Sequence, residues 1–182
     1  MTPKPGGTYR IISAFHGGPM CPDVVERRGS GLKIDQDVQI CRITDGLHHH
    51  FFMDDEEGRH QSSSNCGPAE HPEFWELQRA SADDESVVYL YNPSTERWIN
   101  IPSERGTHDP IRLESDRRKA WRLRAVASTG YYQIIPDDDS NWAISIDDHL
   151  AKWDTHLELR DRLPSADRGW FFIPASADRT DQ

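Results

Sequence analysis

Phe74-Trp75-Glu76-Leu77 is the first of three similar tryptophan-centred stretches in the sequence. The other two are Ala120-Trp121-Arg122-Leu123 and Gly169-Trp170-Phe171-Phe172, and the tryptophans are 46 and then 49 residues apart. In each stretch apolar residues stand at every second position, as they do in half-buried strands. Self-similarity at a regular spacing indicates an internal repeat, so we expect three copies of a unit of roughly 45 residues.

Three further series of short segments recur at compatible spacings. The opening segments are Gly7-Thr8-Tyr9-Arg10-Ile11-Ile12, a degenerate copy at Val87-Val88-Tyr89-Leu90-Tyr91, and Gly130-Tyr131-Tyr132-Gln133-Ile134-Ile135. The middle segments pair Trp98–Ile101 with Trp142–Ile146, and Ile111–Leu113 with Leu157–Leu159. Turn-forming Pro, Gly, Asp or Ser residues bound each segment. Each unit therefore has four expected strands, which in the first unit are Thr8–Ser13, about Asp23–Arg27, about Val38–Ile43, and Phe74–Gln78.

Three four-strand units can close six strands into a barrel and cap it with three hairpins, which leaves no exposed sheet edge. The sequence therefore predicts an all-β fold, a β-trefoil, as one domain over residues 1–182. Repeat one covers about 7–78, repeat two about 84–124 and repeat three about 128–174, with a short tail. A sandwich or another barrel with accidental spacing is the alternative.

A polar insertion at about 45–73 enlarges the first repeat. It contains His48-His49-His50 and Asp54-Asp55-Glu56-Glu57, a composition that cannot bury enough apolar area to order itself. We expect a long surface loop. Its histidines and Cys66 match no defined spacing of metal ligands, so we expect no metal site.

Composition narrows the classes of function. The chain has 182 residues and a net charge of -10, which repels nucleic acid and anionic membranes. It has no apolar run of the roughly 20 residues that span a bilayer. Three cysteines without a CxxC pair, and no signal-peptide pattern at the start, favour a reducing cytoplasm. We also expect a monomer.

Motifs of catalysis are absent from the sequence. There is no Gly-x-Ser-x-Gly, His-Glu-x-x-His, phosphate-binding or dinucleotide-binding pattern. Asp137-Asp138-Asp139 stands between expected strands and is typical of a turn. We therefore expect a protein that is not an enzyme and needs no cofactor.

The opening Gly7-Thr8-Tyr9-Arg10-Ile11, the tryptophan of each closing strand and the final Trp170-Phe171-Phe172 resemble the fungal β-trefoil protease inhibitors, namely the mycocypins and the cospin-like trypsin inhibitors. The resemblance covers about residues 6–44 and 73–174. It implies a cytoplasmic defence protein that inhibits trypsin-like serine or papain-like cysteine proteases reversibly through exposed loops. The implied partner is a target protease.

The resemblance assigns the first candidate loop to the segment that cospin-like inhibitors use against trypsin. It contains Arg27, Arg28, Gly29 and Ser30. A guanidinium can pair in bidentate fashion with a carboxylate at the base of an acidic S1 pocket. The alternative is an ordinary solvated hairpin turn, which the two glycines of Arg-Arg-Gly-Ser-Gly also favour.

The second candidate loop resembles the glycine-containing loop with which mycocypins enter papain-like clefts. It contains Phe15, Gly17, Gly18, Pro19 and Met20, and glycines permit close backbone approach. A plain turn between strands is the alternative.

Asn92 falls where some mycocypins present an asparagine to asparaginyl endopeptidases. Pro93 follows directly, and its ring obstructs the position after a scissile bond. We therefore expect Asn92 to start a turn.

A carbohydrate-binding β-trefoil is the rival hypothesis, because many β-trefoils are lectins. The Gln-x-Trp signature of ricin-type lectins is absent, so we expect the closing-strand tryptophans to pack the barrel. Trp153 matches no repeat position and is the one tryptophan expected to be partly exposed, as a contact for a glycan or a partner. A third hypothesis is a trefoil that binds one specific protein through the insertion.

Overall fold

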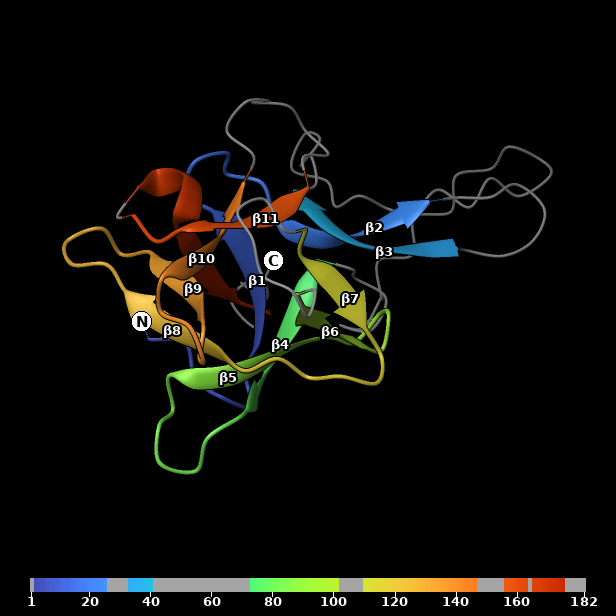
Figure 1. Cartoon of the computed structure of the whole chain (residues 1–182), viewed down its shortest axis with the longest axis horizontal. Helices are drawn as coiled ribbons and strands as arrows, with labels where there is room; N and C mark the ends of the chain where they lie inside the picture. The colour runs from blue at the N-terminus through green and yellow to red at the C-terminus, as the bar shows by residue number, and fades with distance from the viewer. Residues whose placement is uncertain are drawn as a thin grey trace, which may run out of the picture.

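The computed structural model describes residues 2–25, 33–40, 73–101, 110–146, 156–163 and 165–175. The described chain is built almost entirely of short strands (Figure 1). In order they are β1 (Thr8–Ser13), β2 (Met20–Val25), β3 (Lys33–Ile40), β4 (Phe74–Arg79), β5 (Val87–Asn92), β6 (Arg97–Asn100), β7 (Arg112–Glu114), β8 (Trp121–Ala125), β9 (Tyr132–Pro136), β10 (Trp142–Ile146), β11 (Leu157–Asp161) and β12 (Trp170–Pro174). A 3-10 turn, η2 (Ala166–Arg168), precedes β12.

Six of the strands close into a ring. Antiparallel pairing runs from β1 to β4, β5, β8, β9 and β12, and β12 pairs with β1 to complete the barrel. The other six strands form the hairpins β2–β3, β6–β7 and β10–β11, one in each repeat. A six-strand barrel with three hairpins is the β-trefoil architecture, so the predicted fold is confirmed.

The three closing-strand tryptophans connect the hairpins to the barrel. All three are fully buried. Each indole donates its N–H to a backbone carbonyl of the second strand of its own repeat: Trp75 to Met20 at 2.9 Å, Trp121 to Ile99 at 3.2 Å, and Trp170 to Ile144 at 3.2 Å. A buried N–H needs an acceptor, and these bonds supply one in each repeat. The expectation that these tryptophans pack the barrel is confirmed.

Two strands of the first repeat begin earlier than the sequence predicts. The second strand begins at Met20 instead of Asp23, and the third begins at Lys33 and ends at Ile40 instead of spanning Val38–Ile43. Met20 is fully buried in the core and its carbonyl accepts the Trp75 indole N–H, so packing extends the strand into the predicted loop. Residues 45–72 of the insertion lie outside the described residues, whereas its last residue, Glu73, is described.

Cys21 takes part in a disulfide bond. It is buried, and it is the one cysteine among the described residues. Disulfides persist mainly in oxidising compartments, whereas the cysteine pattern favoured a reducing one. The cytoplasmic location therefore stays a prediction.

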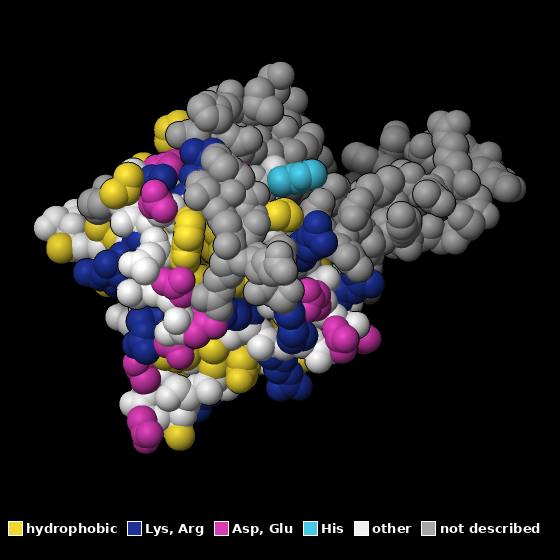
Figure 2. Space-filling view, in the orientation of Figure 1, with side chains coloured by type: hydrophobic (Ala, Val, Ile, Leu, Met, Phe, Trp, Pro, Cys, Tyr) yellow, Lys and Arg dark blue, Asp and Glu magenta, His cyan; other side chains and the backbone are white. Residues whose placement is uncertain are grey.

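No described helix has the length and apolarity that would let it cross a membrane. On the described part of the face in Figure 2, Lys and Arg side chains are interspersed with Asp and Glu. Mixed charge of this kind is typical of a solvated surface. The described part of this face therefore has no broad basic patch that would attract a polyanion.

Candidate functional site

The outward side of three neighbouring strands carries a group of aromatic and polar residues. We call it the β4–β6 face; it consists of Glu76 and Gln78 on β4, Tyr89 and Tyr91 on β5, and Trp98 on β6. Their neighbours Trp75, Leu77, Leu90 and Ile99 point inward and are fully buried, because successive strand residues alternate between the two sides. The five residues of the β4–β6 face are partly exposed.

Strand register aligns these residues across the barrel. Glu76 is the Cα partner of Tyr91, Tyr91 is the partner of Trp98, and Gln78 is the partner of Tyr89. Thr8 on β1 extends the first row, because it is the partner of Glu76. Directly opposed residues on one side of a sheet are in contact range, so these groups form one continuous surface.

The aromatic rings of the face pack against each other and hold a cation. The centroids of Tyr91 and Trp98 are 5.0 Å apart, with an interplanar angle of 41°. The guanidinium of Arg118 lies 4.5 Å from the Trp98 ring centroid and 6.0 Å from that of Tyr89. Aromatic faces are electronegative and attract cations at these distances. The rings therefore form an aromatic surface that attracts positive charge.

Gln78 is oriented by the indole of Trp98. The indole N–H of Trp98 donates to Oε1 of Gln78 at 3.2 Å. An indole can only donate, so the amide oxygen faces Trp98 and the two amide N–H donors remain for another acceptor. The face therefore presents a donor group at Gln78 and an acceptor group at Glu76, two residues apart on one strand.

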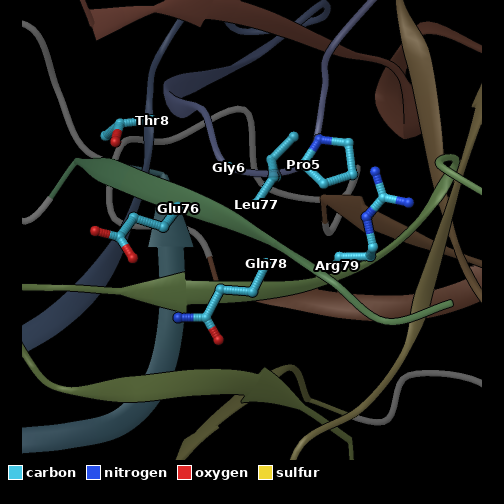
Figure 3. A pocket seen from close by; sticks show the side chains of 7 residues that line it. All are labelled: Pro5, Gly6, Thr8, Glu76, Leu77, Gln78 and Arg79. Atoms are coloured by element: carbon cyan, nitrogen blue, oxygen red, sulfur yellow. The ribbon is translucent and has the colours of Figure 1, made fainter. Parts of the chain in front are cut away.

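A pocket of about 420 Å³ adjoins this face (Figure 3). Its lining residues are Pro5, Gly6, Thr8, Glu76, Leu77, Gln78 and Arg79. The N-terminal segment forms one wall, since the N–H of Gly6 donates to the Leu77 carbonyl at 2.6 Å and the N–H of Leu77 donates to the Gly7 carbonyl at 3.0 Å. Figure 3 shows Glu76 and Gln78 projecting to one side of β4 and Arg79 to the other.

The carboxylate of Glu76 has no ion-pair partner in the described part of the chain, and nearby guanidinium groups are engaged elsewhere. Arg79 pairs with Glu85 at 3.1 Å. Arg10 lies 3.7 Å from Glu73 and 5.1 Å from the Phe74 ring centroid. The negative charge of Glu76 also affects Tyr91. Burial raises the pKa of Tyr91, and the charges of Glu96 and Glu76 raise it further.

The pseudo-threefold fold contains two other rows equivalent to this one, and they have a different chemistry. The residue that follows each closing tryptophan and its barrel partner are Glu76 with Tyr91, Arg122 with Ile135, and Phe171 with Ile12. Of these three pairs, one places a carboxylate beside an aromatic ring. The residues that follow the closing tryptophans, Glu76, Arg122 and Phe171, are partly exposed, so packing of the barrel does not require this difference.

The second predicted loop is an ordered turn with one exposed anchor. Backbone N–H groups of Phe15 and His16 donate to the Ser13 hydroxyl at 3.2 and 3.0 Å, and Gly17 has a φ of 72°. Phe15 is 52% exposed. Gly18, Pro19 and Met20 are buried, so Phe15 and Gly17 are the exposed members of this predicted set.

Asn92 lies inside the fold as a turn residue. It is fully buried, its Nδ2 donates to the Phe74 carbonyl at 3.1 Å, and its Oδ1 accepts the N–H and the hydroxyl of Thr95, each at 3.1 Å. Arg27, Arg28, Gly29, Ser30 and Trp153 lie outside the described residues. The expectation that Trp153 is the one partly exposed tryptophan was wrong, because Trp98 and Trp142 are partly exposed.

Sequence reasoning missed the β4–β6 face. It placed Trp98 in a repeated strand segment and expected exposure at Trp153 instead. The signal that could have found it is the alternation around the buried residues Leu90 and Ile99, which assigns Tyr89, Tyr91 and Trp98 to the outer side. Within the described ranges, no group of three or more His, Cys, Asp or Glu residues could hold a metal ion.

Comparison with known proteins identifies the fold. No family model matches the chain, and no curated protein matches it by sequence. Among solved structures, the Rhizoctonia solani agglutinin has a TM-score of 0.66 at 12% identity, covering 96% of this chain and 99% of that one. A Macrolepiota procera ricin B-like lectin in complex with lactose has a TM-score of 0.65 at 11% identity, covering 95% and 99%.

The designed threefold-symmetric protein ThreeFoil is also similar, with a TM-score of 0.60 at 11% identity and coverage of 92% and 98%. Identities this low carry information about architecture and none about individual binding residues. The structural neighbours and the closed barrel agree, and the chain is a β-trefoil protein.

Proposed function

We propose that this protein is a carbohydrate-binding module and that it binds glycans through the β4–β6 face. The observation that carries the proposal is the partly exposed Tyr91–Trp98 pair, 5.0 Å apart, beside the amide of Gln78 and the carboxylate of Glu76. A sugar ring has an apolar face of C–H groups and an edge of hydroxyls. Flat aromatic rings suit the first, and a paired donor and acceptor suit the second.

The comparisons support this reading at the level of fold. The agglutinin and the lactose-bound lectin share the architecture over nearly the whole chain. Their low identity means that the sugar and the site must be argued from this chain's own residues. The β4–β6 face supplies those residues, whereas the buried closing-strand tryptophans offer no stacking surface.

Trp98→Ala tests the proposal. Loss of an aromatic anchor should lower affinity for a bound oligosaccharide by at least about tenfold, because anchors of this kind carry much of the binding energy. A screen against immobilised glycans identifies a ligand, and isothermal titration calorimetry then compares wild type and variant. Trp142→Ala is the control, since Trp142 is also partly exposed but lies in the third repeat.

Equal affinities of wild type and Trp98→Ala for the selected glycan would reject the β4–β6 face as the binding site. Thermal unfolding of both variants checks that each is folded. A loss of binding in Trp142→Ala alone would show that the binding site lies in the third repeat.

Protease inhibition is the second candidate function, and the loop around Phe15 favours it. A loop held by its own hydrogen bonds loses little entropy when it enters a cleft, and Phe15 is 52% exposed on such a loop. Residual activity of a papain-like protease, titrated with the protein, tests this loop; Phe15→Ala should weaken any inhibition by about tenfold. Undiminished inhibition by that variant contradicts a role for Phe15.

The Arg27 and Arg28 segment requires a separate assay against trypsin. If it occupies an acidic S1 pocket, the double variant Arg27→Ala with Arg28→Ala loses trypsin inhibition and keeps its thermal stability. Inhibition that survives the double change excludes this segment.

A further inference from the structure

We infer that the ligand of the β4–β6 face carries free amino groups, as an oligosaccharide of amino sugars does, and that its ammonium pairs with Glu76. This inference rests on the proposed function, because it identifies the chemical class of the sugar bound there.

The first step is the state of the Glu76 carboxylate. Glu76 is partly buried and lines the 420 Å³ pocket, and its carboxylate makes no ion pair or hydrogen bond within the described part of the chain. A carboxylate shielded from water loses solvation and gains from a cation or donors that approach it. A ligand that brings positive charge to this position therefore gains an interaction that a neutral sugar does not.

The second step is that the cations near the pocket, among the residues that the structure describes, do not fill this role. Arg79 lines the pocket, but its guanidinium contacts Glu85 and the Ala82 carbonyl in the turn after β4. Arg10 is held at Phe74 and Glu73. The carboxylate of Glu76 thus remains available inside the pocket.

The third step is the behaviour of the adjoining aromatic rings. Trp98 already holds a cation, the exposed Arg118 guanidinium, 4.5 Å from its ring centroid. The charge of Arg118 opposes a second cation at Trp98, but no cation in the described part of the chain lies over the Tyr91 ring. Tyr91 and its Cα partner Glu76 therefore both favour positive charge at the pocket end of the row.

The fourth step is the length of the row. Thr8, Glu76, Tyr91 and Trp98 stand on four adjacent strands, which spans about 14 Å at the usual strand spacing. This exceeds one sugar ring, so the row suits an oligomer. The hydroxyl of Thr8 and the amide N–H groups of Gln78 are available for its hydroxyl groups.

The test is calorimetric titration of the full chain with a glucosamine tetramer and with an N-acetylglucosamine tetramer, at physiological ionic strength. We expect the glucosamine tetramer to bind about tenfold more tightly, which is the usual gain from a charge-assisted contact. Glu76→Gln should remove this difference, so that the variant binds the two tetramers with equal affinity. Asp83→Asn is the matched control, because it makes the same charge change at an exposed residue outside the face.

Equal binding of the two tetramers, or a preference that survives Glu76→Gln, overturns the inference while the proposed function stands. A preference lost equally in Asp83→Asn assigns the effect to net charge and also overturns it. If no glycan in the screen or tetramer binds, the proposed function and the inference both fail. Retention of the wild-type unfolding temperature shows that each variant is folded.

Discussion

At the scale of single residues, the candidate face depends on what covers Trp98. One side of its ring contacts Tyr91, and the guanidinium of Arg118 lies over the ring at 4.5 Å. A sugar that stacks on Trp98 has to compete with Arg118 for the same apolar surface. Arg118 is exposed and makes its aromatic contacts at the surface, so displacing it costs little binding free energy.

Arg118→Ala should therefore strengthen binding of a neutral oligosaccharide by about two- to fivefold, because an exposed cation–π contact of about 0.5–1 kcal/mol no longer has to be broken. Calorimetry with the N-acetylated tetramer measures this change. Arg117→Ala is the control, since Arg117 pairs with Glu114. Weaker binding in Arg118→Ala would show instead that the guanidinium contacts the sugar.

At the scale of elements, Arg122 on β8 links two loops. Its guanidinium lies 2.5 Å from Oδ2 of Asp84, in the loop between β4 and β5, and 2.7 Å from Oδ1 of Asp137, in the loop between β9 and β10. Asp84 also accepts hydrogen bonds from the Ser86 hydroxyl at 2.6 Å and the Ser86 N–H at 2.9 Å. These contacts connect loops that are more than fifty positions apart in the chain.

The pKa of Asp84 follows from these contacts. The Ser86 hydroxyl, followed by the Arg122 guanidinium, lowers it from 3.8 to about 2. Because the folded state lowers this pKa, the carboxylate stabilises the fold above the unfolded value of 3.8, and that contribution is lost as the pH falls through about 2.

The difference in unfolding temperature between wild type and Asp84→Asn should therefore shrink as the pH falls from 4 to 2. Thermal unfolding followed by circular dichroism at several pH values measures it. Asp83→Asn, at a neighbouring exposed residue, serves as the control. A difference that is constant over this range would show that ionisation of Asp84 does not stabilise the fold.

At the scale of the whole molecule, three equivalent repeats share one core and differ on the outside. The indole-to-carbonyl bond recurs in every repeat, because each hairpin must be tied to the barrel in the same way. The outward residues after the closing tryptophans are free of that requirement, and they differ in charge and size. Function in a symmetric scaffold is therefore to be sought where one repeat departs from the other two.

The barrel could be predicted from the sequence because its determinants are local and repeated. Strand alternation, turn residues and the spacing of Trp75, Trp121 and Trp170 each follow from the order of residues along the chain. Where the repeats were least similar, prediction failed. The second strand starts at Met20 because burial of its side chain and the bond from Trp75 outweigh the turn-forming residues before it.

The sequence by itself determined the three four-strand repeats and the inward position of their tryptophans, because the alternation of apolar and polar residues along a strand decides which side chains are buried. Only the tertiary structure decided the β4–β6 face. Glu76 lies about 15 residues from Tyr91 and more than 20 from Trp98 along the chain, and they become neighbours through the register of β4, β5 and β6. Register depends on the closure of the whole barrel, and no local pattern encodes which outward side chains it brings together.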